Sequence, residues 1–305
     1  MKEFTLRQLQ YFVAVADEGS ISAAARSLHV SPGAVSLAVS ELETSLGVQL
    51  TLRRRAMGVT LTRAGLLAAE QARAVLRESD ELHNISQVLR GELSGTLRIG
   101  CFTTLSPWLL PRIIAHFARR HPGVRVEVLE TSSDVLQQRL QDGDLDVCLM
   151  YAQHIRTRID HEEIVPVRVQ LVLPADHRLA DRDEVAFREL GDEPAVLLAL
   201  RPVRDLVEEI LRKTGFRPNV AWRIANVETI RSMVGRGLGY SVLMGRPFGD
   251  RTYDGLPLVY KRIADEVPDN AVVLAHPRGS VPTAKVRALA DFCRREFAEE
   301  GHPVQ

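Results

Sequence analysis

The chain has 305 residues and a mass of 34.0 kDa, which suggests about two domains at roughly 150 residues each. Its composition, with 45% hydrophobic and 26% charged residues, excludes collagen-like, disordered and disulfide-rich proteins. Apolar runs such as 195–200 reach six residues, whereas a transmembrane helix needs about 20. The charged residues within 1–12 argue against a signal peptide.

Three cysteines, Cys101, Cys148 and Cys293, are widely spaced and form no CxxC pair. Their odd number and spacing predict reduced thiols in the cytoplasm rather than a disulfide framework or a zinc site.

The net charge is zero, with 39 Lys and Arg against 39 Asp and Glu, but the charges are unevenly distributed. The segment 44–69 contains no acidic residue and carries Arg53, Arg54, Arg55 and Arg63. This local cationic patch is suited to a polyanion, and a solvated basic loop is the plainer alternative.

Three amphipathic helices are predicted in the first 47 residues. The first carries apolar residues at helical spacing from Leu6 and ends at Gly19; Ser20 or Ser22 caps a second, short helix. Ser31 caps a third helix, which stops at Gly47. Two helices joined by a tight turn are typical of a helix-turn-helix, although an ordinary helical hairpin has the same pattern.

A strand-like hairpin is predicted over 49–61, with Gly58 at its turn and the three arginines inside it. A basic hairpin after a helix-turn-helix indicates a winged helix, whose wing lies against the phosphate backbone. Thr62 to Arg90 then reads as one long helix with an approximate heptad stripe, suited to an intermolecular contact. Gly91 to Thr96 is typical of a hinge.

From Thr96 onward strands and helices alternate, which predicts an α/β domain with mostly parallel sheets. The predicted strands are 97–101, 124–130, 146–150, 167–173, 195–200, 221–224, 240–244, 258–260 and 272–276. Predicted helices cover 111–120, 134–140, 202–213 and 228–235, and a further helix opens at Ser106.

The segment LRQLQYFVAVADEGSISAAARSLHVSPGAVSLAVSELETSLGVQL, Leu6 to Leu50, followed by LTRAG from Leu61 to Gly65, resembles the LysR-type transcriptional regulators. The resemblance continues through GTLRIG, DGDLDVCL, LVLPADHRLA and GRGLGYSVLM and covers nearly the whole chain.

The resemblance implies a winged helix-turn-helix over 1–60, a dimerising linker helix over 61–90, a hinge over 91–95 and an effector domain over 96–305. The effector domain is expected to resemble periplasmic binding proteins, with subdomain I at 96–166 and 267–305 and subdomain II at 167–266. Such regulators bind promoter DNA and a small-molecule effector in the cytoplasm, as homodimers or homotetramers, and are not enzymes.

The third helix is expected to face DNA, although it departs from the family at Pro32-Gly33, Leu37 and Ala38 and carries no charge from Ser31 to Ser40. Base reading then depends on hydroxyl groups and on contacts to thymine methyl groups. The candidate DNA-binding residues are Ser31, Pro32, Gly33, Ser36, Leu37, Ser40, Arg53, Arg54 and Arg55.

The effector is expected between the subdomains, at the carboxyl ends of strands. Thr103 and Thr104 precede a helix N-terminus, where free N–H groups favour a carboxylate, although plain helix capping is the better explanation of any one hydroxyl taken alone. Arg201 or Arg204 could pair with such an anion, with placement on the surface as the alternative for each. The candidate effector-binding residues are Thr103, Thr104, Leu105, Thr131, Ser132, Tyr151, Arg201, Asn226 and Val227.

No catalytic motif, cofactor motif or metal-ligand spacing is found in the sequence. The alternative to a regulator is a small-molecule binding protein or enzyme whose N-terminal helices serve only for assembly. Assembly alone does not require the arginine patch at 53–55, which therefore favours the regulator.

Overall fold

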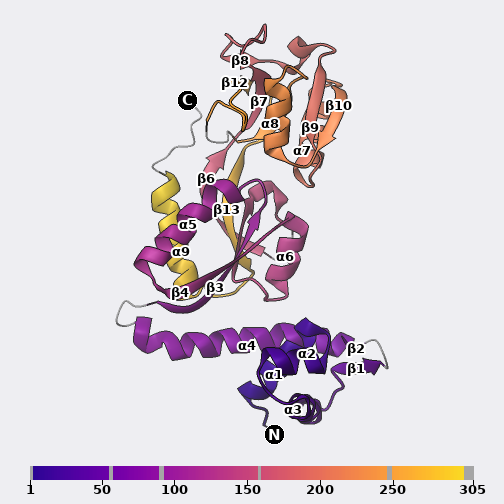
Figure 1. The fold of residues 1–305 in the computed structure, drawn as a ribbon, viewed down its shortest axis with the longest axis vertical. Helices are drawn as coiled ribbons and strands as arrows, with labels where there is room; N and C mark the ends of the chain where they lie inside the picture. The colour runs from indigo at the N-terminus through magenta and orange to yellow at the C-terminus, as the bar shows by residue number, and fades with distance from the viewer. Residues whose placement is uncertain (1–2, 55–57, 89–92, 157–158, 246–248, 299–305) are drawn as a thin grey trace. The chain divides into compact units, whose positions relative to one another are not determined.

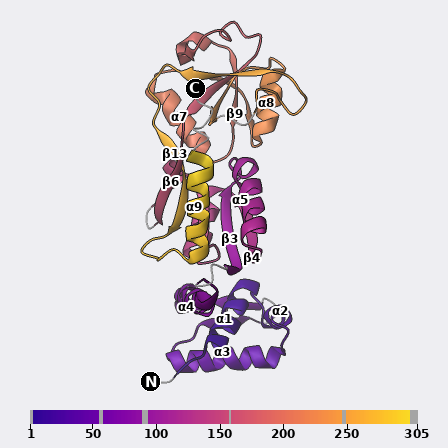
Figure 2. The same cartoon turned by 90° about the vertical axis from the view of Figure 1, so that its left-hand side faces the viewer.

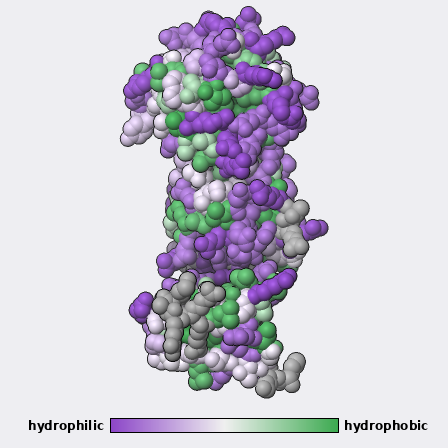
Figure 3. Space-filling view, turned by 90° about the vertical axis from the view of Figure 1, so that its right-hand side faces the viewer, coloured by the Kyte–Doolittle hydropathy of each residue, from purple (hydrophilic) through white to green (hydrophobic). Residues whose placement is uncertain are grey.

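The computed structural model describes residues 3–54, 58–88, 93–156, 159–245 and 249–298. The chain divides into two compact units: Met1–Gly95 with Gly123–Arg125 and Arg139–Leu145, and the remainder (Figure 1). Among the described residues no helix is long and apolar enough to cross a bilayer. The face of the molecule in Figure 3 is mostly hydrophilic, with apolar patches between.

The three predicted N-terminal helices are confirmed as α1 (Leu6–Glu18), α2 (Ile21–Ser27) and α3 (Pro32–Leu46). Local caps define their ends: Ser20 and Ser31 accept N–H bonds at the starts of α2 and α3, and left-handed glycines end α1 and α3. Their shared core includes Phe12, Val15, Ala24, Val35 and Leu42.

The predicted hairpin is confirmed as β1 (Thr51–Arg54) paired antiparallel with β2 (Gly58–Leu61). Gly58 is the first residue of β2, opposite Arg54, rather than a residue of the turn. A glycine is required there because its φ is +79° and a Cβ would lie 2.5 Å from the carbonyl oxygen of Gly19. Arg55 lies outside the described residues.

The long helix is confirmed as α4 (Arg63–Val88). Its start is fixed to the hairpin: the Thr62 N–H donates to the Leu50 carbonyl, and the Thr62 hydroxyl donates to the Gln49 carbonyl. Ser94 and Gly95 already belong to the strand that follows, so this strand begins inside the segment expected to be a hinge.

A five-stranded sheet has the order β4-β3-β5-β13-β6. Figure 1 shows α5 and α9 on one side of this sheet and α6 on the other. The bounds are β3 Ser94–Phe102, α5 Ser106–Arg120, β4 Gly123–Thr131, α6 Ser133–Gln141, β5 Val147–Tyr151, β6 Ile159–Val167, β13 Asn270–Pro277 and α9 Ala284–Ala298. β6 and α9 are not among the predicted elements.

The other strands form a four-stranded sheet of order β11-β7-β12-β8 and a parallel pair, β9 and β10. Figure 2 shows α7 and α8 on either side of β9. The bounds are β7 Val169–Pro174, β8 Glu184–Val185, β9 Pro194–Leu198, α7 Val203–Lys213, β10 Asn219–Ile224, α8 Val227–Gly235, β11 Ser241–Met244 and β12 Leu258–Ile263, with short 3-10 turns at Ala152–His154 and Phe187–Leu190.

The strands from β3 to β6 thus pair with β13 in one sheet, and the strands between Arg168 and 264–269 form the four-stranded sheet and the β9–β10 pair. We refer to these two halves as the first and second subdomains. The expectation of mostly parallel sheets is wrong: β13 runs antiparallel to β5 and β6, and β7 runs antiparallel to β11 and β12. The strands that leave the first subdomain and return to it pair in opposite directions: β6 with β13, and β7 with β12.

Candidate functional site

The start of α3 presents the exposed residues that a DNA-reading surface requires. Leu37 is 61% exposed, and Val35 and Val39 on the same helix are buried. Ser36 is half-buried and Ser40 is exposed. The exposed first turn comprises Ser31, which caps the helix through the Ala34 N–H, with Pro32 and Gly33.

Arg53 and Arg54 lie on β1, where the backbone is described and their side chains are not. Glu43, which the sequence analysis does not select, sets the start of this strand. Its Oε1 accepts the backbone N–H groups of Leu50 and Thr51, both at 2.8 Å, and the Thr51 hydroxyl at 3.0 Å. The hairpin is thereby fixed to the last turns of α3.

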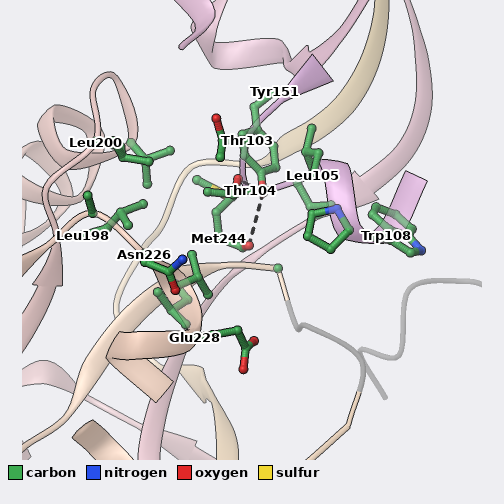
Figure 4. A pocket seen from close by; sticks show the side chains of 17 residues that line it. Thr103, Thr104, Leu105, Trp108, Tyr151, Leu198, Leu200, Asn226, Glu228 and Met244 are labelled. Carbon is green, nitrogen blue, oxygen red and sulfur yellow. Dashed lines mark hydrogen bonds between the residues drawn. The ribbon is translucent and has the colours of Figure 1, made fainter. Parts of the chain in front are cut away.

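A cavity of about 310 Å³ lies between the two subdomains (Figure 4). This volume suits a small metabolite. Six of the nine candidate effector residues line it. The full lining is Thr103, Thr104, Leu105, Pro107, Trp108, Tyr151, Val167, Leu198, Leu200, Val203, Ala225, Asn226, Val227, Glu228, Leu243, Met244 and Gly245.

Three helices begin at this cavity. The lining includes residues at the starts of α5 (Leu105, Pro107), α7 (Val203) and α8 (Asn226, Val227). The Asn226 side chain caps α8 by accepting the Thr229 N–H, but no side chain caps α5 or α7. Helix starts without a side-chain cap offer positive backbone dipoles to a ligand.

Hydroxyl groups connect the two subdomains at the cavity wall. The Tyr151 hydroxyl of the first subdomain donates to the Met244 carbonyl of the second at 3.4 Å and lies 3.4 Å from the Thr104 hydroxyl (Figure 4). Burial raises the pKa of Tyr151 to about 12, so its hydroxyl keeps its proton. The Thr103 hydroxyl donates to the Thr131 carbonyl at 3.3 Å.

Three candidate residues are not among those that line the cavity: Thr131, Ser132 and Arg201. Thr131 takes part only through the carbonyl oxygen that Thr103 contacts. The Arg201 side chain is 66% exposed and pairs with Asp205 at 3.2 Å.

The apolar walls of the cavity and Glu228 are features that the sequence pattern does not indicate. Glu228 lies in the first turn of α8 and bonds at 2.6 Å to Arg231, a buried arginine one turn further along. Leu198 and Leu243 form part of the cavity wall, and both lie on strands whose apolar sequence is typical of a buried core. Nothing in a single sequence indicates which apolar strand ends meet around a cavity.

All three cysteines are buried thiols. Burial raises the pKa of Cys101 to about 12 and raises the pKa of Cys148 and Cys293 further. Among the described residues no group of three or more His, Cys, Asp or Glu side chains is placed to hold a metal ion.

Comparison with known proteins gives matches along most of the chain. The LysR substrate binding domain matches residues 90–298, and the bacterial regulatory helix-turn-helix protein of the lysR family matches residues 6–66. A hydrogen peroxide-inducible genes activator from Pectobacterium carotovorum subsp. carotovorum is 31% identical over 294 residues, which cover 96% of each chain.

Two solved structures from Pseudomonas aeruginosa have similar folds. HinK, a LysR family transcriptional regulator, has a TM-score of 0.63 at 33% identity and covers 97% of this chain and 99% of its own. Full-length OxyR, in a cysteine-to-aspartate variant, has a TM-score of 0.77 at 27% identity, with coverage of 96% and 98%. The expected architecture, a helix-turn-helix domain followed by a two-subdomain α/β domain like that of periplasmic binding proteins, is confirmed. The chain therefore belongs to the LysR family, as a DNA-binding transcription regulator with an effector-binding domain.

Proposed function

We propose that this regulator binds promoter DNA through the start of α3 and the β1–β2 wing, and that a small organic acid in the cavity between the subdomains controls its activity. The observation that carries the effector site is the cavity itself: it lies between two subdomains, at the starts of three helices, two without side-chain caps. Binding to promoter DNA is proposed to take place in the cytoplasm.

Leu37 is proposed to read thymine methyl groups, and Ser31, Pro32, Gly33, Ser36 and Ser40 to approach the backbone or base edges. Leu37 is exposed on the first turns of α3, where a solvated apolar side chain contributes nothing to the core. Leu37→Ala is expected to weaken binding to the target site about three- to tenfold in a gel shift, with no effect on random DNA. Leu46→Ala, at an exposed position in the last turn of α3, is the control. Equal losses on target and random DNA contradict a reading role.

Arg53, Arg54 and Arg55 are proposed to contact phosphates from the wing. Replacing all three by alanine is expected to weaken binding to every sequence and to reduce the salt dependence of log K by up to about 3. The matched control replaces Arg182, Arg188 and Arg217, three exposed arginines of the second subdomain. Its change in charge is the same, so an equal loss in both variants points to net charge rather than phosphate contact.

The carboxylate of the effector is proposed to lie at the starts of α5 and α7, beside Thr103 and Thr104, with Tyr151, Leu105, Asn226 and Val227 around the ligand. An anion there gains from helix dipoles that no side chain caps. Thr104→Val keeps the shape of the side chain and removes its hydroxyl. We expect calorimetry to show weaker binding of carboxylic acids to this variant, with DNA binding in the absence of acid unchanged.

Thr131→Val is the matched control, because the Thr131 side chain does not line the cavity. Equal binding of a panel of carboxylic acids by wild type and Thr104→Val contradicts the proposed anchor. Arg201 is proposed only as a secondary anchor, since its guanidinium is exposed and paired with Asp205.

Oligomerisation is proposed to involve α4, with a homotetramer built from dimers. Apolar side chains on this helix are exposed to solvent, as is typical of a surface that another chain covers: Leu66, Leu67, Val75 and Leu82. Leu82→Arg is expected to lower the mass measured by light scattering, while circular dichroism of the chain is kept. An unchanged mass contradicts this use of α4.

Peroxide sensing is the alternative that a relative's name suggests. A thiol reacts with peroxide as its thiolate and needs access to solvent. Because all three cysteines are buried with a raised pKa, thiol oxidation is disfavoured, and a small-molecule effector is the better supported signal.

A further inference from the structure

The cavity wall carries a negative charge, whereas a site for an anion alone would carry a positive one. Among the residues that line the cavity in the described part of the chain, Glu228 is the only one with a formal charge at neutral pH. Most of the other lining side chains are apolar. A ligand that fills this space therefore needs an apolar body, and the wall offers a carboxylate at one edge.

Glu228 is held in place by a buried cation. The Arg231 side chain is 4% exposed, and its guanidinium donates to the Glu228 Oε1 at 2.6 Å. It also donates to the Tyr260 hydroxyl and to the carbonyl oxygens of Gly249 and Arg251, at 2.7–2.9 Å. Four bonds fix the guanidinium, and its bond to Oε1 favours one position of the Glu228 carboxylate.

The bond from Arg231 occupies Oε1, so the second carboxylate oxygen of Glu228 can accept a bond from a ligand. The Glu228 side chain is 47% exposed. In Figure 4 it lies beyond Asn226 and Met244 as seen from Thr103. The acceptor at Glu228 and the uncapped start of α5 next to Thr104 thus lie at different ends of the cavity.

We propose that the effector is a zwitterion with an apolar body, an ω-amino acid whose protonated amine bonds to Glu228 while its carboxylate, at the other end of an apolar chain, lies at the uncapped helix starts. This rests on the proposed function of the cavity. It assigns Glu228 as the residue that distinguishes an amino acid from the corresponding simple acid. A charge-assisted hydrogen bond to a carboxylate fixed by Arg231 supplies the selectivity.

Two matched pairs of probes test the assignment by calorimetry on the full-length protein. 6-Aminohexanoate is compared with hexanoate, and 5-aminopentanoate with pentanoate; in each pair only the terminal amine differs. We expect one amino acid to bind at least about tenfold more tightly than its partner acid. Glu228→Gln, whose amide oxygen can still accept from Arg231, should reduce this preference to less than about threefold.

Glu209→Gln is the control, because Glu209 lies on α7, pairs with Lys213 and does not line the cavity. It should leave the preference unchanged. Thermal melting of each variant shows that the fold is retained.

Three results overturn the inference: partner acids that bind as tightly as the amino acids, a preference that survives Glu228→Gln, or no binding of either amino acid up to about 10 mM. The proposed function fails separately, if DNA binding by the full-length protein responds to no carboxylic acid of a wider panel. A partner acid that binds in the cavity and is weakened by Thr104→Val retains the proposed function and overturns only the role of Glu228.

Discussion

The Glu43 carboxylate binds Thr51 twice, through the backbone N–H at 2.8 Å and through the hydroxyl at 3.0 Å. The same oxygen accepts the Leu50 N–H. A single side chain near the end of α3 thus satisfies the first backbone donors of the wing, and the Thr51 side chain is buried against it. The position of the β1–β2 hairpin relative to α3 depends on this acid.

Glu43→Ala is expected to lower the free energy of unfolding by about 2 to 3 kcal/mol, because two buried N–H groups lose their acceptor. Urea denaturation followed by circular dichroism measures this change. Glu41→Ala removes an acid that, within the described part of the chain, bonds to the Gln8 side chain, and it should cost less than about 1 kcal/mol. Equal costs for the two variants show that Glu43 does not organise the wing.

Gly65 is required by a close approach of two backbones. A Cβ at this position would overlap the carbonyl oxygen of Leu50. Gly65→Ala is therefore expected to destabilise the protein by about 2 kcal/mol or more, although alanine favours helices by about 1 kcal/mol. Gly33→Ala, in a helix with open space around the new methyl group, should be neutral or slightly stabilising. Thermal melting of both variants checks the contrast, and a stabilising Gly65→Ala contradicts it.

The cysteines are expected to be inert in the folded protein. Because burial raises the pKa of Cys101 from about 9 to about 12, almost no thiolate forms at pH 8, and the other two thiols behave alike. An Ellman assay should detect no thiol in the native protein and all three after denaturation in guanidinium. Millimolar peroxide should leave DNA binding unchanged. A fast-reacting thiol in the native state restores the redox alternative.

The helices of the N-terminal unit follow from local chemistry, which a sequence shows directly. Ser31 precedes Pro32, Gly47 ends the apolar spacing, and each cap acts within a few residues of its helix end. The strand β6 is different, because Glu162, Glu163 and Pro166 interrupt the apolar pattern by which a strand is predicted. It forms because it pairs with β13, which lies more than 100 residues later in the chain. Sequence spacing carries no record of such a pairing. Helix α9 is predictable from the sequence, because Val286, Leu289 and Cys293 lie on one apolar helical face.

The candidate site divides in the same way. Thr103 and Thr104 could be selected because they stand between a strand and a helix start, a local pattern. Arg201 is a candidate only because a guanidinium can bind a carboxylate, and in the structure it pairs with Asp205 of α7 instead. Glu228 could not be selected, because its place at the cavity depends on where α8 meets the other subdomain and on the buried guanidinium of Arg231.

His154 makes the stability of the effector domain sensitive to acid. Its ring is buried against Phe102 and Tyr151, and its Nδ1 lies 2.7 Å from the Ser133 hydroxyl. Its Nε2 is buried and has no hydrogen-bond partner among the described residues. Burial therefore lowers the pKa of His154 from 6.5 to about 3.

Below pH 6.5 this histidine is protonated in the unfolded chain but stays neutral in the folded chain. The free energy of unfolding therefore falls as the pH falls. Between pH 7 and pH 5 the loss from His154 alone is about 2 kcal/mol, at about 1.4 kcal/mol per pH unit below 6.5. Urea denaturation of His154→Gln is expected to show a shallower decline over this range than wild type by about that amount. His161→Gln, at an exposed position on β6, should follow the wild-type slope. If His154→Gln loses stability in parallel with wild type from pH 7 to pH 5, then His154 takes up its proton in the folded state as readily as in the unfolded chain.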